Sequence, residues 1–254
     1  MADSGEGLER SPFSKPGFIV SALVVALVLV LGVGVIIGRR SDDDSGAADA
    51  TADPTGSAGV STTTNAGGTS TDGDASICGL EGEVLEPADL DLAPTVDDWE
   101  YQGTTAYPVS AVYGPAATDA SGYRYCFQHS PEGALFAAAN ALTQGSDSTN
   151  SSTWIEYFLA EGPYRDELLA DEGESGTTSD MRLKIVGFKI LAYDGEVARV
   201  DLAFTGLTSG RTTTFSGVYE LVWQNEDWKI SADVPQPVDV IAIPDTVGYV
   251  SWQE

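Results

Sequence analysis

Residues 180–234 read DMRLKIVGFKILAYDGEVARVDLAFTGLTSGRTTTFSGVYELVWQNEDWKISADV, and this stretch decides the fold of the chain. Apolar and polar residues alternate along it with a period of two, which is typical of β-strands with one buried face. Asp194-Gly195 has the composition of a tight hairpin turn. The alternation changes phase at Val186-Gly187, as one extra residue in a β-bulge would cause. The stretch therefore predicts a curved antiparallel meander of four strands with one apolar face.

Helices are predicted just before this meander. Residues 130–132 (Ser-Pro-Glu) combine a capping serine, a proline at the first helical position and an acid at the positive end of the helix dipole. A capping-box pattern at 153–156 starts a second helix, and Gly-Pro at 162–163 ends it and opens a third. We therefore predict an α+β domain of about three helices packed on a curved four-stranded antiparallel sheet, in a cone-like arrangement.

An uncharged apolar run precedes the domain. Residues 17–38 read GFIVSALVVALVLVLGVGVIIG, and at about 1.5 Å per residue a helix of this length covers a bilayer core of about 30 Å. The run is longer than the core of a cleaved signal peptide and no A-x-A site follows it, so we expect one uncleaved transmembrane helix. Gly34 and Gly38 form a small-xxx-small pair, which makes a homo-oligomer through these glycines one expectation.

Composition divides the rest of the chain into a tail, a tether and one domain. Residues 1–16 form the tail. Residues 39–76 are acidic and rich in Ser, Thr and Gly, with almost no large apolar side chain, so they cannot repay the entropy of ordering. The tether and the two cysteines favour a single-pass protein of the cell membrane, with a cytoplasmic N-terminus and the C-terminal domain, 77–254, outside. That domain comprises an irregular part, 77–129, the helices and meander, 130–234, and a C-terminal extension, 235–254.

Both flanks of the domain are interrupted by prolines. Within 77–129, short β-like pieces are expected at 99–101, 106–112 and 122–127. The extension, 235–254, contains several prolines and yet is largely apolar. Two interpretations of it remain open, since it can pack on its own domain or dock on a partner.

The net charge of −27 restricts the partners. Over residues 77–254, acidic side chains outnumber basic ones by 29 to 8, so a phosphate backbone would be repelled and we predict no nucleic-acid partner. The aspartates that come closest to a cation site lack the glycine and the spaced glutamate of a calcium loop, and we predict no metal site. They are Asp89, Asp91, Asp97 and Asp98.

Cys78 and Cys126 are the only cysteines of the chain. In an oxidising compartment they would form a disulfide, which would constrain the unfolded state by about 4 kcal/mol. Two unpaired buried thiols are the alternative. Two cysteines and a single histidine are too few for an ordinary structural zinc site.

No residue cluster has a catalytic signature. His129, the only histidine, precedes a helix cap, and we interpret it as fixing the geometry of that loop. A Cys–His nucleophile pair would need Cys126 to be free. An acid and a tyrosine in an isomerase-like pocket would be Asp201 and Tyr219, but the two project from opposite faces of their strands. We therefore predict no catalytic residue, no cofactor and no enzyme activity.

Several short motifs nevertheless resemble a known group of proteins. They are Ser-Pro-Phe at 11–13, Cys-Gly-Leu at 78–80, CFQHSPEGAL at 126–135, GPYR at 162–165, Val-Gly-Phe at 186–188 and Asp-Trp-Lys at 227–229. The chain resembles uncharacterised single-pass actinobacterial membrane proteins linked to conjugative or integrative elements, with a ketosteroid-isomerase-like (cystatin-like) domain outside the membrane.

This resemblance implies a scaffold or interaction protein with protein partners in the envelope. Such a protein would be an accessory subunit of a conjugation or type IV secretion-like machine. The alternative is an envelope sensor that binds a small ligand in the interior of the cone.

Overall fold

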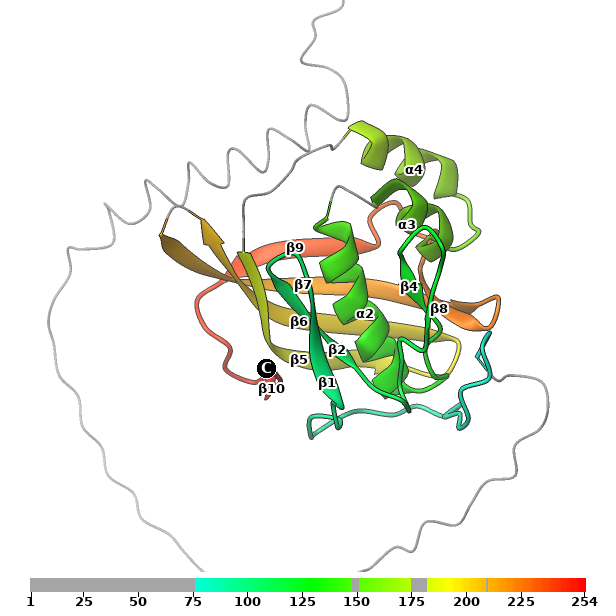
Figure 1. Ribbon diagram of the computed structural model, residues 1–254, viewed down its shortest axis with the longest axis horizontal. Helices are drawn as coiled ribbons and strands as arrows, with labels where there is room; N and C mark the ends of the chain where they lie inside the picture. Colours follow the sequence, from blue (N-terminus) through cyan, green and yellow to red (C-terminus); the bar gives the residue numbers. More distant parts are fainter. Residues whose placement is uncertain (1–75, 148–150, 175–181, 209) are drawn as a thin grey trace, which may run out of the picture. The chain divides into compact units, whose positions relative to one another are not determined.

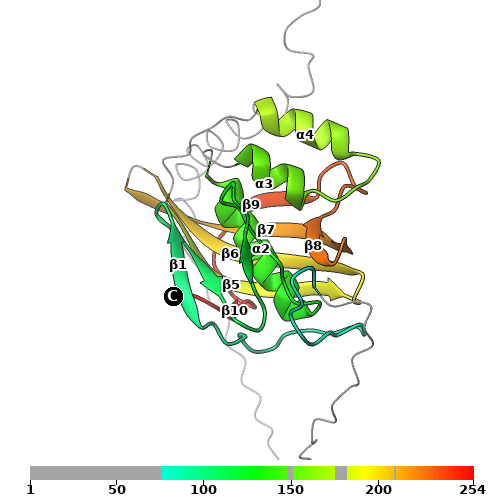
Figure 2. The ribbon, with the colours of Figure 1, turned by 45° about the vertical axis from the view of Figure 1, so that its right-hand side comes forward.

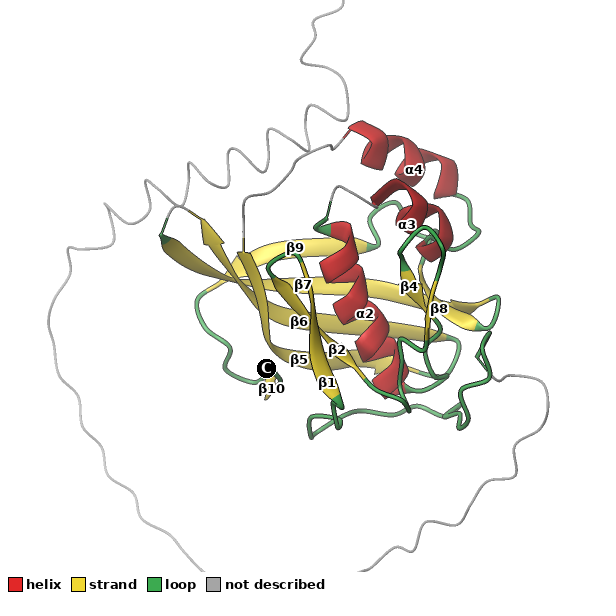
Figure 3. Ribbon diagram, in the orientation of Figure 1, coloured by secondary structure: helices red, strands yellow, loops and turns green. Residues whose placement is uncertain are grey.

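The structure, a computed structural model, describes residues 76–147, 151–174, 182–208 and 210–254, and strands dominate it (Figure 3). Three helices lie between the N-terminal and C-terminal strands in the chain. In order, the elements are β1 (Asp98–Gln102), β2 (Thr105–Val109), β3 (Ala117–Thr118), β4 (Arg124–Tyr125), α2 (Pro131–Gly145), α3 (Ser151–Phe158), α4 (Arg165–Glu174), β5 (Arg182–Tyr193), β6 (Val197–Thr208), β7 (Arg211–Gln224), β8 (Asp227–Ile230), β9 (Val238–Ile243) and β10 (Val250–Ser251).

One six-stranded antiparallel sheet forms the centre of the domain (Figure 1). Its order is β10-β5-β6-β7-β8, and β9 also pairs with β7. β8 pairs with the last four residues of β7, and β9 pairs with Thr214–Tyr219 of the same strand. The two strands therefore share one edge of β7. Two further two-stranded sheets, β1-β2 and β3-β4, stand apart from the main one.

Local signals in the meander agree with the sequence. The register of β5 against β6 shifts between Ile185 and Gly187, which confirms the predicted bulge. A second shift follows at 190–192 and had no counterpart in the sequence pattern. Asn225 and Glu226, between β7 and β8, have φ values of 56° and 61°. Both lie in the left-handed region that a tight hairpin turn requires.

Helix α2 is buried on every side. Ser130 caps it and accepts a hydrogen bond from Gly133 N–H, which confirms the predicted helix start. On one side, α2 packs against β5 and β6 of the main sheet. β2 and β4 cover other sides, and Arg124 of β4 donates to Asn140 and Gln144 of α2. Figure 2 shows α2 crossing the sheet beside the short hairpins. A helix that is apolar nearly all round is stable only in such a buried position.

The C-terminal extension packs on its own domain. It runs from β9, on one edge of the sheet, to β10, which pairs with β5 near the other edge. Between them, Tyr249 donates to Asp201 Oδ2 and packs its ring under the Lys189 ammonium, so the segment crosses part of the sheet face opposite α2. Trp252 then enters the core beside Phe136 and Phe188. Of the two interpretations left open by the sequence, the structure shows the first.

The predicted fold class, α+β with a four-stranded sheet, is wrong. The described residues are mainly β, and the main sheet has six strands. The extension, 235–254, supplies two of them, and the irregular part, 77–129, supplies two hairpins. The β-like pieces expected at 99–101, 106–112 and 122–127 overlap β1, β2 and β4, but their pairing into hairpins and the two strands of the extension were not predicted. The helices do not form one layer on the sheet, because α2 lies between the sheet and other strands.

Across the described ranges, none of the helices combines the length and the apolar character needed to cross a membrane. This finding contradicts the predicted location as a single-pass protein of the cell membrane. Residues 1–75 lie outside the described residues. They include the predicted tail, 1–16, the predicted span, 17–38, with Gly34 and Gly38, and the predicted tether, 39–76, except for its last residue.

Candidate functional site

Cys78 and Cys126 are joined by a disulfide, with their Cα atoms 6.0 Å apart. This confirms the predicted bond and excludes the alternative of two free thiols. Ile77 N–H also donates to Glu226 O, 2.7 Å away, so the start of the domain is held against the β7–β8 turn. The bond therefore ties the first described residues to the core, because Cys126 is fully buried.

His129 has a structural role, in which its ring links two segments of the domain. Its Nε2 lies 2.5 Å from Gly195 O, and its ring stacks on Trp223 at 3.9 Å with an interplanar angle of 4°. A carbonyl oxygen only accepts hydrogen bonds, so Nε2 carries a proton. The ring therefore joins the segment before α2 to the β5–β6 turn. Because Cys126 is in the disulfide, the two residues form no nucleophile pair.

Asp201 and Tyr219 do not meet in a pocket. Asp201 accepts hydrogen bonds from Ser216 Oγ and Tyr249 OH, both at 2.7 Å, on the face opposite α2. Tyr219 lies in the hydrophobic core on the other face. The isomerase-like arrangement weighed from the sequence is therefore not formed.

The aspartates at 89, 91, 97 and 98 do not converge. In the part of the chain that the structure describes, no group of three or more Asp, Glu, His or Cys side chains is placed to hold a metal ion. Three of these carboxylates instead accept hydrogen bonds from backbone N–H groups: Asp89 from Leu90, Asp98 from Trp99 and Asp97 from Ala111.

Sequence reasoning missed a buried carboxylate at Asp227, which the pattern marks only as a turn residue. Its Oδ1 accepts from Phe127 N–H and Trp228 N–H, and its Oδ2 accepts from Cys126 N–H and Tyr157 OH, all at 2.8 to 3.0 Å. Burial raises the pKa of Asp227, and the N–H donors of Cys126 and Phe127 oppose this rise. Asp227 thus holds three segments of the core together.

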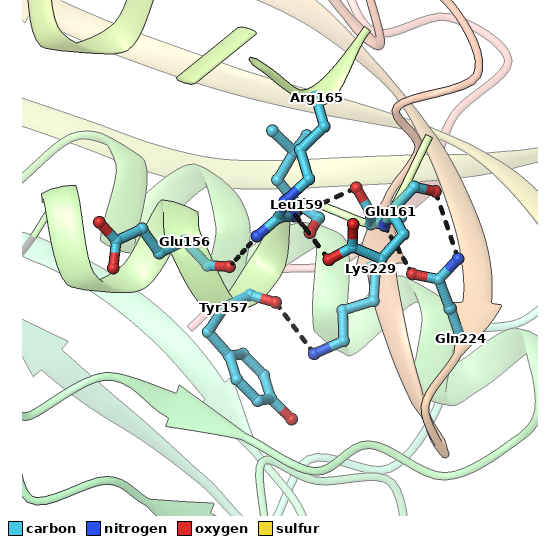
Figure 4. A network of polar contacts seen from close by, with 8 residues as sticks. Glu156, Tyr157, Leu159, Glu161, Arg165, Gln224 and Lys229 are labelled. Carbon is cyan, nitrogen blue, oxygen red and sulfur yellow. Dashed lines mark hydrogen bonds and ion pairs between the residues drawn. The ribbon is translucent and has the colours of Figure 1, made fainter. Parts of the chain in front are cut away.

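The cationic side chains of Lys229 and Arg165 bind backbone oxygens at the C-terminal end of α3 (Figure 4). Lys229 Nζ donates to Tyr157 O at 2.9 Å and lies 3.2 Å from the centre of the Tyr157 ring. Burial lowers the pKa of Lys229 to about 8. Cations stabilise the carbonyl end of a helix dipole, so this network has a structural role. The Arg165 guanidinium donates to the backbone oxygens of Glu156, Leu159 and Ala160.

β9 presents an open backbone edge. Glu220 N–H donates to Pro237 O at 2.8 Å, which sets the hydrogen-bonding phase of β9 against β7. In an antiparallel pair, hydrogen-bonded residues alternate with residues whose backbone groups point away. The N–H and C=O groups of Val238, Val240 and Ala242 therefore point away from β7. No described strand pairs with that side of β9.

The side chains of β9 give this edge little protection against pairing, since Asp239 is its single charged residue. Val240 is 45% exposed and Ile241 is 51% exposed. They lie on opposite faces of the strand, since successive residues alternate. Natural edge strands usually carry lysine, proline or a bulge that prevents pairing with another strand. Residues 231–254 contain no Lys or Arg, and β9 itself contains no proline.

A surface groove borders β9 on the face opposite α2. It has a volume of about 330 Å³ and lies beside the Arg199–Glu220 ion pair, whose atoms are 2.7 Å apart. Asp239 of β9 also lines it and has no ion-pair partner among the residues that the structure describes. The groove can therefore accept a basic side chain. Its lining residues are Arg199, Val218, Glu220, Gln236, Pro237 and Asp239.

Comparison with known protein families identifies the family of this chain. The sequence model of the family described as Domain of unknown function (DUF8175) matches residues 50–251, so the chain belongs to this family. No curated protein and no solved structure shows significant similarity to the chain.

Proposed function

We propose that this member of the DUF8175 family is a non-enzymatic interaction subunit that binds an extended segment of another protein along β9. The open edge of β9 carries this proposal. An extended peptide that adds to such an edge gains backbone hydrogen bonds along its whole length. Val240 and Ile241 offer apolar contacts on the two faces of the added strand.

Charge favours a basic partner segment. Asp233, Asp239 and Asp245 lie on β9 or close to its ends, and no basic residue occurs between residues 231 and 254. A lysine or arginine side chain of the added segment can enter the groove beside β9 and face Asp239. Opposite charges across an interface speed up association and select between partners.

The chain would act as an accessory scaffold subunit in a conjugation or type IV secretion-like machine. The short motifs that resemble proteins linked to conjugative and integrative elements support this part of the proposal. β9 pairs with Thr214–Tyr219 of β7 in the main sheet, so the binding edge is ordered before a partner binds. A preorganised edge loses less entropy when a partner binds.

The packed interior argues against a sensor that binds its ligand between helix and sheet. Large side chains fill this space and are fully buried, so they leave little room for a ligand in the described part of the domain. Examples are Phe127, Phe136, Phe188, Leu202 and Trp228.

Site-specific crosslinking tests the proposal. A photoreactive amino acid replaces Val240 in the full chain, in the cells that naturally produce it. The matched control carries the same photoreactive amino acid in place of Val247, an 83% exposed loop residue after β9. We expect a discrete adduct with one protein from position 240 and a much weaker one from position 247.

A blocking substitution makes the test specific to the edge. Ile241→Lys introduces the charge that edge strands use to prevent pairing, and Val247→Lys adds the same charge off the strand. The adduct at position 240 should disappear with Ile241→Lys and persist with Val247→Lys. An adduct that is unaffected by Ile241→Lys, or no adduct at all, overturns the proposal.

A further inference from the structure

A second surface pocket lies between the two short hairpins that flank α2. Its volume is about 400 Å³, within the range of small-molecule sites. β1 and β2 supply one wall, and β3 and β4 supply the other. The lining residues are Asp97, Glu100, Val109, Ser110, Ala111, Pro115, Ala116, Ala117, Thr118 and Arg124.

Arg124 is buried at this pocket and forms no direct ion pair with a described residue. It is only 9% exposed, and its Nε donates to Asn140 Oδ1 at 2.8 Å. Its guanidinium carbon lies 3.6 Å from the centre of the Tyr107 ring. The Nη2 atom is buried and has no hydrogen-bond partner, and no carboxylate of the described residues lies within ion-pair distance of Arg124.

A buried guanidinium in this state lacks a hydrogen-bond acceptor for one of its nitrogens. It has five N–H donors in a planar fork that matches a carboxylate. Buried charges are normally paired, since an unpaired one is costly to remove from water. The Tyr107 ring and the charges of Glu100 and Asp147, which lie beyond ion-pair distance, compensate part of this cost. A cation–π contact is worth about 2 kcal/mol when desolvated, and the buried Nη2 group still has no hydrogen-bond acceptor. A carboxylate supplied by a ligand would complete the site.

Two acids of the same pocket define the rest of the ligand. Asp97 Oδ2 accepts from Ala111 N–H at 2.7 Å, and Glu100 Oε2 accepts from Tyr107 OH at 2.5 Å. Each carboxylate keeps a second oxygen that no described residue binds through a hydrogen bond. Two negative charges in the pocket that Arg124 also lines disfavour a phosphate and favour a ligand that also carries a positive group.

We propose that this pocket binds a zwitterion, either a free α-amino acid or a short peptide. Its carboxylate pairs with Arg124, and its ammonium group faces Asp97 and Glu100. This site is separate from the β9 edge, and its residues come from different elements. It is also not the interior between α2 and the sheet, since the hairpins lie against other sides of the helix.

Ligand-induced thermal stabilisation of the full chain tests the proposal. The probes are the twenty common amino acids and glycylglycine, each at about 10 mM, since a ligand that binds only the folded state raises Tm. The controls are N-acetylated and C-amidated forms of each probe that binds, and inorganic phosphate. We expect at least one zwitterion to raise Tm, and neither blocked form nor phosphate to do so. If single amino acids bind, the ligand is a free amino acid. If only glycylglycine binds, the ligand is a short peptide.

Variants locate the binding. Arg124→Gln and Glu100→Gln should each weaken binding of that probe at least 10-fold by calorimetry. Glu100→Gln keeps an acceptor for Tyr107 OH, so it serves as the test if Arg124→Gln does not fold. Glu167→Gln, which removes a charge on α4, should leave the affinity unchanged. No stabilisation by any probe, equal binding of the blocked forms, or unchanged affinity in Glu100→Gln overturns the proposal.

Discussion

Replacement of Asp227 by asparagine should destabilise the domain by about 2–4 kcal/mol, and the hydrogen bonds around this side chain set that value. The carboxylate accepts four bonds, two on each oxygen. The amide oxygen of asparagine can keep the pair from Phe127 and Trp228. The amide nitrogen then faces Cys126 N–H and Tyr157 OH. The hydroxyl can rotate to accept, but Cys126 N–H loses its partner.

The magnitude follows from these changes. A buried donor without a partner costs about 1–3 kcal/mol, and two charge-assisted bonds that become neutral lose about 1 kcal/mol each. Relief from burying a charge offsets part of this sum, since burial already raises the pKa of Asp227. The opposite orientation of the amide is worse, because it leaves two N–H groups without an acceptor.

Urea unfolding followed by tryptophan fluorescence measures the change, because Trp228 is fully buried beside the substituted residue. The matched control is Tyr157→Phe, which removes one hydroxyl and keeps the ring. It should cost about 1 kcal/mol. If Asp227→Asn costs less than Tyr157→Phe at an unchanged m-value, the argument that Asp227 organises the core is refuted.

Three further predictions concern other contacts. Replacing Cys78 and Cys126 by serine should lower the free energy of unfolding by about 4 kcal/mol, and equal stability of this variant and the oxidised protein in urea would contradict the expected constraint. Lys229 has a folded pKa of about 8, below its unfolded value of 10.5, so the unfolded state binds more protons between these values and stability should rise with pH there. After a discount for solvent screening, the rise from about pH 7.5 to about pH 9.5 should be about 1–2 kcal/mol and should vanish in Lys229→Met; the same slope in both proteins would exclude Lys229 as its source. Trp252→Ala should cost about 3–5 kcal/mol because the ring is buried in the core, whereas Gln253→Ala, at an exposed neighbour, should cost almost nothing in the same assay.

Local structure was predictable where local signals act alone. The serine cap and proline at the start of α2 require only their own turn of helix, and both are found as predicted. The β5 bulge follows from a change of phase within a few residues. The disulfide was predictable as a pairing because the chain has only two cysteines.

The candidate sites could not be predicted in the same way. The apolar run at 238–243 was visible, yet only the register of β9 on β7 shows which backbone groups remain free. Arg124 is an ordinary basic residue in the sequence. That its buried Nη2 group lacks a hydrogen-bond partner becomes visible only when Tyr107 and Asn140, from other elements, are placed around it.

By itself, the sequence determined which segments become strands of the meander, where α2 begins and which cysteines pair, because each depends on residue spacing or on the lack of alternatives. Tertiary structure alone decided that the C-terminal extension supplies two strands to the sheet, and that two proline-flanked hairpins enclose α2. The alternation of apolar and polar residues determines which face of a strand is buried. Which strands become its neighbours in the sheet depends on contacts between residues far apart in the chain.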